Sequence, residues 1–125
     1  ALFSGDEAYL RREIETILPV VHAGSKILKL IIESGILSED QIRFCCTLYG
    51  NYPVDFLKTS TGFAEKGASL EAVKLMRSLL PENIRIKASG GIRHYAQVRQ
   101  YLEAGATRIG CSAGVAIMQE AVQQV

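Results

Sequence analysis

Four short apolar segments of the 125-residue chain are each followed by a longer amphipathic segment, and this alternation limits the folds that are open to the chain. The short segments have the apolar and β-branched composition of strands, and the longer ones repeat apolar residues at helical spacing. Strands that alternate with helices over short connections are parallel and are joined by right-handed crossovers. Ser38 and Ser69 stand where two of the helices begin and are expected to cap them. The sequence therefore predicts an α/β domain over residues 1–125, with a first helix at 6–23 and strands at about 26–33, 54–58, 84–87 and 106–111, each followed by a helix.

The predicted strands have two unlike faces. Side chains alternate between the faces of a strand, so each strand keeps a mostly apolar face for the helices. The opposite face carries charge, at Lys29, Glu33, Lys58, Arg85, Lys87 and Arg108. Such charge is costly inside a two-layer fold, whereas the inner face of a (β/α)8 barrel leads to the active site at the strand carboxyl ends. Because a full barrel takes about 250 residues, the chain is predicted to be one half-barrel domain.

Composition excludes several classes of protein. Apolar residues make up 48% of the chain and charged residues 22%, which suits a folded core. The net charge of +1 gives no reason to expect a nucleic acid or an acidic membrane as a partner, and no apolar run approaches the roughly 18 residues of a membrane span. Six charged residues in the first 20 positions argue against a signal peptide.

Three cysteines, Cys45, Cys46 and Cys111, are an odd number without a C-x-x-C motif. This pattern argues against a disulfide framework or a zinc site and favours a reducing, cytoplasmic location. We expect all three to be buried as apolar fillers of the core. His22 and His94 have no partner at a useful spacing, and we expect structural roles for both.

Three lysines occupy the same position in successive strand–helix units. Lys29, Lys58 and Lys87 are separated by 29 residues each time and lie on the charged face of their strands. We therefore expect their amines to converge in space. A lysine crowded by another cation loses its proton more readily, and the neutral amine is the form that makes a Schiff base with a carbonyl. The plainer interpretation is that each lysine ends a strand and extends into solvent.

Small, glycine-containing loops follow the last three predicted strands. They cover residues 59–62, which also offer hydroxyls, residues 89–91 and residues 110–114. Backbone N–H groups in such loops, close to helix N-termini, favour the binding of phosphate. The loops after the last strands of a barrel often form such a site. Taken alone, each loop is more simply a tight turn without a ligand, but together, after consecutive parallel strands, the loops favour a phosphate site.

Three segments match the motifs of a known family. They are FLKTSTGF at 56–63, IKASGGIR at 86–93 and LKLIIESG at 28–35. In this order and at this spacing they resemble the Schiff-base segment, the second-lysine segment and the preceding strand of deoxyribose-phosphate aldolases. The similarity runs from residue 1 to about residue 120 and concerns the C-terminal half of the family's barrel. In complete family members, four further strands and a catalytic Asp would precede the position of Ala1.

The resemblance implies a class I aldolase that needs no metal or other cofactor. Its reaction would interconvert 2-deoxy-D-ribose 5-phosphate with acetaldehyde and D-glyceraldehyde 3-phosphate. By this resemblance Lys58 is the Schiff-base nucleophile, Lys87 is the cationic neighbour that lowers the pKa of Lys58, and Lys29 is a further polar partner. Ala88 stands where the family usually has Pro, and the last residue of the phosphate site is Ala where Ser is commoner. The residues implied around the substrate phosphate are Gly62, Gly90, Gly91, Gly110, Cys111, Ser112 and Ala113.

Two interpretations of function stay open. One is a lyase of the aldolase type that acts in deoxyribonucleotide catabolism. The other is a half-barrel that folds and self-associates, with residual phosphate binding and little turnover. Four strands leave two open edges, which favour a homodimer or a larger assembly. Without the other half and its Asp, we expect the isolated chain to be impaired as an enzyme.

Overall fold

The computed structural model describes residues 7–32, 34–60 and 69–123. In these residues five α-helices alternate with four β-strands, and one short 3-10 helix follows the first strand. The predicted order, a helix followed by four β-α units, is present. The elements are α1 (Glu7–Ala23), β1 (Lys29–Ile31), η1 (Ser34–Ile36), α2 (Glu39–Tyr49), β2 (Phe56–Lys58), α3 (Leu70–Leu79), β3 (Arg85–Ser89), α4 (Tyr95–Ala104), β4 (Arg108–Gly110) and α5 (Gly114–Gln123).

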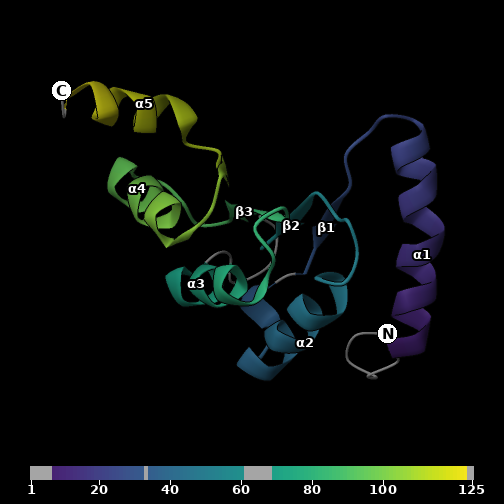
Figure 1. Cartoon of the computed structure of the whole chain (residues 1–125). Coiled ribbons are helices and arrows are strands. Elements are labelled where there is room, and N and C mark those ends of the chain that lie inside the picture. Colours follow the sequence, from purple (N-terminus) through teal and green to yellow (C-terminus); the bar gives the residue numbers. More distant parts are fainter. Residues whose placement is uncertain (1–6, 33, 61–68, 124–125) are drawn as a thin grey trace.

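The four described strands form one parallel sheet in the order β1-β2-β3-β4. The helices lie in an arc around this sheet, from α1 at one end to α5 at the other (Figure 1). Parallel strands that neighbour one another in chain order, with their helices outside, are the arrangement of a (β/α)8 barrel. The predicted fold class, an α/β chain of four parallel β-α units equivalent to half a barrel, is therefore confirmed.

Several strands differ in length from the prediction. β1 covers Lys29–Ile31 of the predicted 26–33, and β4 covers Arg108–Gly110 of the predicted 106–111. Each of these strands pairs over three residues with its one described neighbour. An apolar run that extends beyond its ladder partner has no strand to pair with, so β propensity alone overstates its length. β3 instead runs two residues beyond the predicted end, to Ser89.

Two of the predicted helix caps are present. The Oγ of Ser38 accepts a hydrogen bond from the N–H of Gln41 at 3.1 Å, and the Oε1 of Gln41 accepts one from the N–H of Ser38 at 2.8 Å. The Oγ of Ser69 accepts from the N–H of Ala72 at 3.1 Å. These bonds satisfy N–H groups that have no partner within a helix, so local sequence sets the start of α2 and of α3.

The hydrophobic core lies between the sheet and the helices that cover its outer face. Leu57 and Ile86 from the strands and Val73 and Met76 from α3 are all fully buried. Leu57 and Ile86 are register partners on β2 and β3. The strand faces predicted to be apolar are thus the ones that meet the helices.

The cysteines divide into two kinds. Cys45 and Cys46 on α2 are buried, as predicted, and their burial raises the pKa of Cys45 to about 11 and that of Cys46 to about 12. Cys111 is exposed, so the prediction of a buried side chain was wrong for this residue. It follows β4, which in the described chain is an edge strand with one neighbour.

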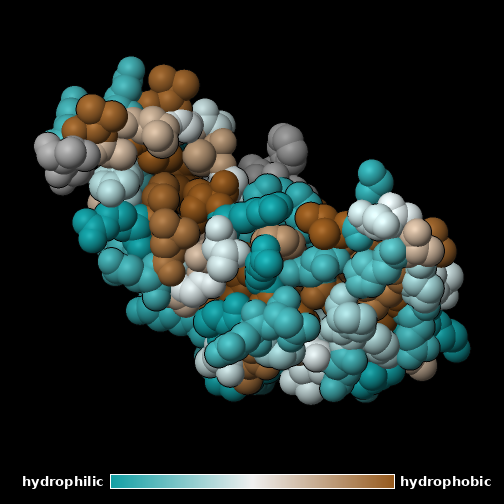
Figure 2. All heavy atoms as spheres, turned by 45° about the horizontal axis from the view of Figure 1, so that its top comes forward, coloured by the Kyte–Doolittle hydropathy of each residue, from teal (hydrophilic) through white to brown (hydrophobic). Residues whose placement is uncertain are grey.

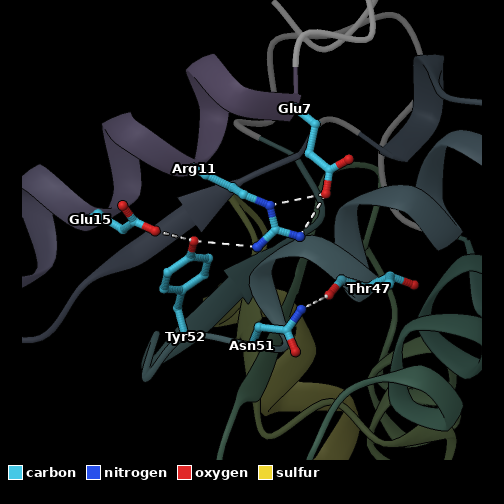
Figure 3. Close-up of polar contacts among 6 residues, drawn as sticks. All are labelled: Glu7, Arg11, Glu15, Thr47, Asn51 and Tyr52. Atoms are coloured by element: carbon cyan, nitrogen blue, oxygen red, sulfur yellow. Dashed lines mark hydrogen bonds and ion pairs between the residues drawn. The ribbon is translucent and has the colours of Figure 1, made fainter.

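Helix α1 is attached to the turn after α2 by a group of polar side chains (Figure 3). The hydroxyl of Tyr52 donates to Glu15 at 2.7 Å and accepts from Arg11 at 3.4 Å, while Arg11 also pairs with Glu7 at 2.6 Å. Contacts as exposed as these contribute little stability, so burial of apolar side chains holds most of the helix in place. The buried residues of α1 are Leu10, Ile14 and Leu18.

Apolar side chains remain exposed at both ends of the sheet. On α5, Val115, Met118 and Val122 are 76%, 65% and 71% exposed. Figure 2 shows apolar side chains gathered at this end of the molecule, at the upper left. At the other end, Ile31 on the edge strand β1 is 47% exposed. None of the helices in the described residues is long and apolar enough to cross a membrane.

Candidate active site

Lys58 and Lys87 lie side by side on the charged face of the sheet. They are register partners on β2 and β3, and Arg108 on β4 is the next partner, beside Lys87. The period-two alternation of strands sets all three side chains on the same face. Both lysines are only partly exposed, and no ion pair in the described residues includes either of them. Three cations thus stand in a row across neighbouring strands.

Lys29 lies on the same face but one layer lower. Its register partner is Phe56, two residues before Lys58. The structure therefore brings Lys58 and Lys87 directly together and places Lys29 diagonally below them. A constant spacing of 29 residues along the chain does not by itself fix the neighbours, because the hydrogen-bonded register between strands decides them.

The pKa of Lys87 is lowered from the usual value for a lysine. Partial burial of the ammonium group is the largest cause, followed by the positive charges of Lys58, Lys29 and Arg108. Each cause disfavours the charged form of the amine. A lysine with a lowered pKa exchanges its proton closer to neutral pH, which suits a group that takes part in acid–base chemistry.

An aromatic ring lies beneath this row of cations. The guanidinium carbon of Arg108 is 4.5 Å from the centre of the Phe56 ring, and that of Arg85 is 5.8 Å away. The face of an aromatic ring attracts cations, so Phe56 holds Arg108 beside Lys87. Both arginines and Phe56 were expected on this face from the sequence, but the role of the ring was not foreseen, because a phenylalanine in a strand resembles an ordinary core residue.

All the buried polar side chains in the described residues lie at the carboxyl ends of β1, β2 and β3. They are Ser34, Thr59, Ser60 and Ser89. Thr59 and Ser60 belong to the loop whose hydroxyls suggested a ligand from the sequence, yet both are fully buried. The Oγ of Ser34 is buried and has no hydrogen-bond partner in the described part of the chain. The ends of three strands thus carry hydroxyls inside the protein.

Six of the seven residues predicted to surround a phosphate lie at the end of β4 or in the loops that follow β3 and β4. Gly90 and Gly91 have φ of +93° and +76°, a conformation that side chains disfavour. Ser89 and Gly110 are register partners, so the loops after β3 and β4 start together. Cys111, Ser112 and Ala113 connect β4 to α5, and the first two of them are exposed. Gly62 lies outside the described residues.

Gly110 lies in close contact with Ser89 and Lys87 of the neighbouring strand β3. A Cβ at this position would lie 2.9 Å from the Cβ of Ser89 and 3.1 Å from the Cε of Lys87. Such short separations would be overpacked in a protein interior, where atoms already lie in close contact. The missing side chain at Gly110 therefore leaves room for the stem of Lys87, a role that was not foreseen from the sequence.

Each of the two histidines contacts a carboxylate away from the lysines. His22 lies 3.0 Å from Asp55, and His94, which occupies the N-cap position of α4, lies 3.2 Å from Glu120. These contacts fit the structural roles expected for both. No group of three or more His, Cys, Asp or Glu side chains in the described ranges could hold a metal ion.

The chain is similar to proteins of known family. No protein-family model matches it. The deoxyribose-phosphate aldolase of Caldanaerobacter subterraneus subsp. tengcongensis is 44% identical over 120 residues, which are 95% of this chain and 52% of that protein. The solved structure of QR15, an aldolase, superposes with a TM-score of 0.87 at 36% identity, over 99% of this chain and 55% of that one. A tetrameric deoxyribose-phosphate aldolase from Aeropyrum pernix gives a TM-score of 0.84 at 28% identity, over 98% and 53%.

The chain spans about half the length of the curated relatives it matches. Within that half, sequence identity and fold agree along almost the whole chain. The resemblance predicted from the three lysine-containing segments is thereby confirmed: over nearly all of its length, the chain is homologous to about half of a deoxyribose-phosphate aldolase.

Proposed function

We propose that the protein acts as a Schiff-base aldolase on 2-deoxy-D-ribose 5-phosphate, with Lys58 as the nucleophile. The observation that carries the proposal is the register pair of Lys58 and Lys87 on the charged face, directly below two glycine-containing loops. An amine for the carbonyl and backbone N–H groups for the phosphate are the two things that such a substrate requires. Because the chain spans about half of its relatives, the activity of the whole protein is part of the proposal.

The reaction begins when the neutral Nζ of Lys58 attacks the aldehyde carbon of the open-chain sugar phosphate. Loss of water gives an iminium, which withdraws the electrons of the carbon–carbon bond that breaks. The neutral amine of Lys87 takes the proton of the C3 hydroxyl, D-glyceraldehyde 3-phosphate leaves, and an enamine remains on Lys58. Lys87 returns the proton to the enamine carbon, and hydrolysis of the resulting iminium releases acetaldehyde and the amine of Lys58. The lowered pKa of Lys87 supports a role beside Lys58, because an amine that gives up its proton more readily can take and return a proton during the reaction.

The remaining predicted residues have supporting roles in this proposal. Lys29, one layer below, adds positive charge to the site. The phosphate of the substrate binds at the loops after β3 and β4, where small residues leave N–H groups accessible. The residues assigned to the phosphate there are Gly90, Gly91, Gly110, Cys111, Ser112 and Ala113. Gly62, which follows β2 outside the described residues, is assigned by the resemblance alone. The proposed reaction requires no cofactor.

The alternative is a half-barrel that binds phosphate and self-associates with little turnover. The exposed apolar side chains of α5 and the unpaired edges of β1 and β4 in the described sheet favour this second candidate, because open parallel edges and apolar surface promote association. One relative of known structure is a tetramer. We propose that this chain also forms a homodimer or a larger assembly.

Reductive trapping tests the aldolase proposal. The chain is incubated with deoxyribose 5-phosphate or acetaldehyde and borohydride, and modified peptides are mapped by mass spectrometry. We expect an adduct on Lys58 that is absent from Lys58→Arg, a variant that keeps the charge but cannot form an imine. Equal labelling of Lys58 and the exposed Lys26 and Lys74, or no adduct, would overturn the proposal.

Light scattering coupled to size-exclusion chromatography tests the assembly. A mass of two or more chains supports the association of half-barrels, and a single chain at all concentrations contradicts it. Trapping and mass are independent readouts. An adduct on Lys58 in a single-chain species would support the first candidate alone.

A further inference from the structure

The ends of β2 and β3 are joined by two buried hydroxyls. The Oγ1 of Thr59 donates to the carbonyl of Ser89 at 3.1 Å and accepts from the N–H of Ser89 at 3.1 Å. The Oγ of Ser89 donates to the carbonyl of Ser60 at 2.5 Å. We call these three bonds the hydroxyl clasp. We propose that the clasp positions Lys58 against Lys87, which makes Thr59 and Ser89 positioning residues of the active site.

The hydroxyl of Thr59 replaces a backbone group at the point where the sheet ladder breaks. The N–H of Thr59 donates to the carbonyl of Lys87 at 3.0 Å, on the β3 side. Its carbonyl turns the other way and accepts from the N–H of Ser34 at 2.7 Å. The N–H of Ser89 therefore needs an acceptor other than that carbonyl, because a buried N–H without a partner is costly. The side chain of Thr59 supplies this acceptor.

The clasp lies immediately beyond the two lysines. Lys58 directly precedes Thr59, and Lys87 lies two residues before Ser89. The lysines are register partners on one face, and no ion pair in the described chain includes them. Two neighbouring ammonium groups repel each other, and this repulsion acts to spread the ends of β2 and β3. The clasp opposes the spreading at the place where it would begin.

A purely apolar role or a ligand-binding role for Thr59 accounts for less of this geometry. A threonine with an apolar role would need no hydroxyl, yet both the donor and the acceptor capacity of Oγ1 are used. A phosphate-binding hydroxyl would need access to the ligand, yet Thr59 and Ser60 are fully buried. The inference rests on the proposed function for the chemical role of the two lysines, but the positioning itself concerns only their separation.

The test is the titration of Lys87 in variants of Thr59. The rate at which acetic anhydride modifies Lys87, relative to exposed Lys26, is followed against pH by peptide mass spectrometry. The charged groups that face Lys87 are Lys58 on β2, Lys29 on β1 and Arg108 on β4. When the clasp is lost, the ammonium of Lys58 moves away from Lys87, and the amine of Lys87 holds its proton more firmly. Since one pKa unit is tenfold in protonation equilibrium, we expect the relative reactivity of Lys87 at neutral pH to fall at least about threefold in Thr59→Val.

The matched control is Thr59→Ser, which keeps the hydroxyl and should restore the wild-type profile. A merely structural threonine would change the thermal midpoint in both variants without moving the titration of Lys87. An unchanged profile in Thr59→Val, or a shifted profile in Thr59→Ser, would overturn the inference. If Thr59→Val does not fold, Ser89→Ala carries the test, because it removes the bond to Ser60 alone. In that case a smaller shift in the same direction is expected, and no shift overturns the proposal.

Trapping of the Lys58 imine in the same variants separates this inference from the proposed function. A shifted titration without any wild-type adduct would support the clasp and reject the aldolase. A wild-type adduct without a shifted titration would do the reverse.

Discussion

At the residue scale, Lys87 is the side chain whose chemistry the fold changes most clearly. Its ammonium is partly buried and faces three other cations, and its pKa is lowered for these two reasons, burial first. The room for its stem comes from Gly110 on the next strand. Its environment therefore depends on residues from the three other strands, none of which is adjacent to it in the chain.

The lowered pKa of Lys87 predicts a pH dependence of stability. When the pH is below the pKa of Lys87 in the folded state, this lysine is charged and its destabilising effect on the fold is at its full value. Between that pKa and the ordinary value of 10.5 the unfolded chain binds more protons, so the free energy of unfolding rises with pH. We expect Lys87→Met to raise the urea midpoint at neutral pH and to remove this part of the pH slope. The control is Lys74→Met on α3, and equal slopes in both variants and in the wild type would contradict the prediction.

The different burial of the three cysteines predicts how fast each thiol reacts. Cys111 is exposed, whereas Cys45 and Cys46 are buried with raised pKa values of about 11 and about 12. The thiolate is the reactive form, so one thiol of the three should react quickly with a chromogenic disulfide reagent in the folded protein and the other two only after unfolding. Cys111→Ser should abolish the fast phase. If more than one thiol reacts in the fast phase, Cys45 or Cys46 on α2 is accessible in the folded protein and the prediction fails.

At the scale of elements, β3 and β4 approach each other closely where the two glycine-containing loops begin. Ser89 and Gly110 are register partners, and the stem of Lys87 lies over the same place. The two strands can approach each other so closely because Gly110 has no side chain. The separation of these two strands is thus set by a single residue type at a single position.

We expect Gly110→Ala to destabilise the fold by about 1–3 kcal/mol, the usual cost of overpacking. The added Cβ would lie too close to Ser89 and to Lys87, so one of them must move. Denaturant titration measures the change. The matched control is Gly114→Ala at the start of α5, where no atom lies within 4 Å of the added carbon. Equal unfolding midpoints for the two variants would contradict the predicted close contact.

At the scale of the whole molecule, charge is unevenly distributed. The net charge is only +1, yet five basic side chains gather on one face of the sheet. The sheet also ends in two edges that are unpaired in the described chain. A half-barrel of this kind holds repulsive charge on its inner side, and the described helices lie in an arc on its outside (Figure 1).

The clustered charge predicts that salt stabilises the fold. At an ionic strength of about 0.1 M the screening length is about 10 Å, which weakens the repulsion among neighbouring cations on the face. We expect the urea midpoint to rise between low and moderate concentrations of sodium chloride. The double variant Lys58→Gln, Lys87→Gln should show a smaller rise. If salt lowers the midpoint of the wild type, ion pairs elsewhere outweigh the cluster and the prediction fails.

Much of the architecture could be predicted because it depends on local rules. The alternation of strands and helices, the serine caps of α2 and α3, and the sharing of one face by Lys58 and Lys87 follow from propensity, capping and the period of a strand. The family resemblance rests on short motifs, which are also local. These features need no knowledge of how one strand lies against the next.

The rest depends on contacts between distant segments, which only the tertiary structure decides. Lys29 has the same spacing as the other lysines, but the register of β1 places it beside Phe56. Thr59 belongs to a loop whose polar composition suggests exposure, yet hydrogen bonds to β3 hold it in the interior. Cys111 is as apolar as Cys45 but follows an edge strand. By itself, the sequence determined the elements, their faces and the family, whereas strand register and burial, which arise from hydrogen bonding and packing across the sheet, decided which of these residues meet.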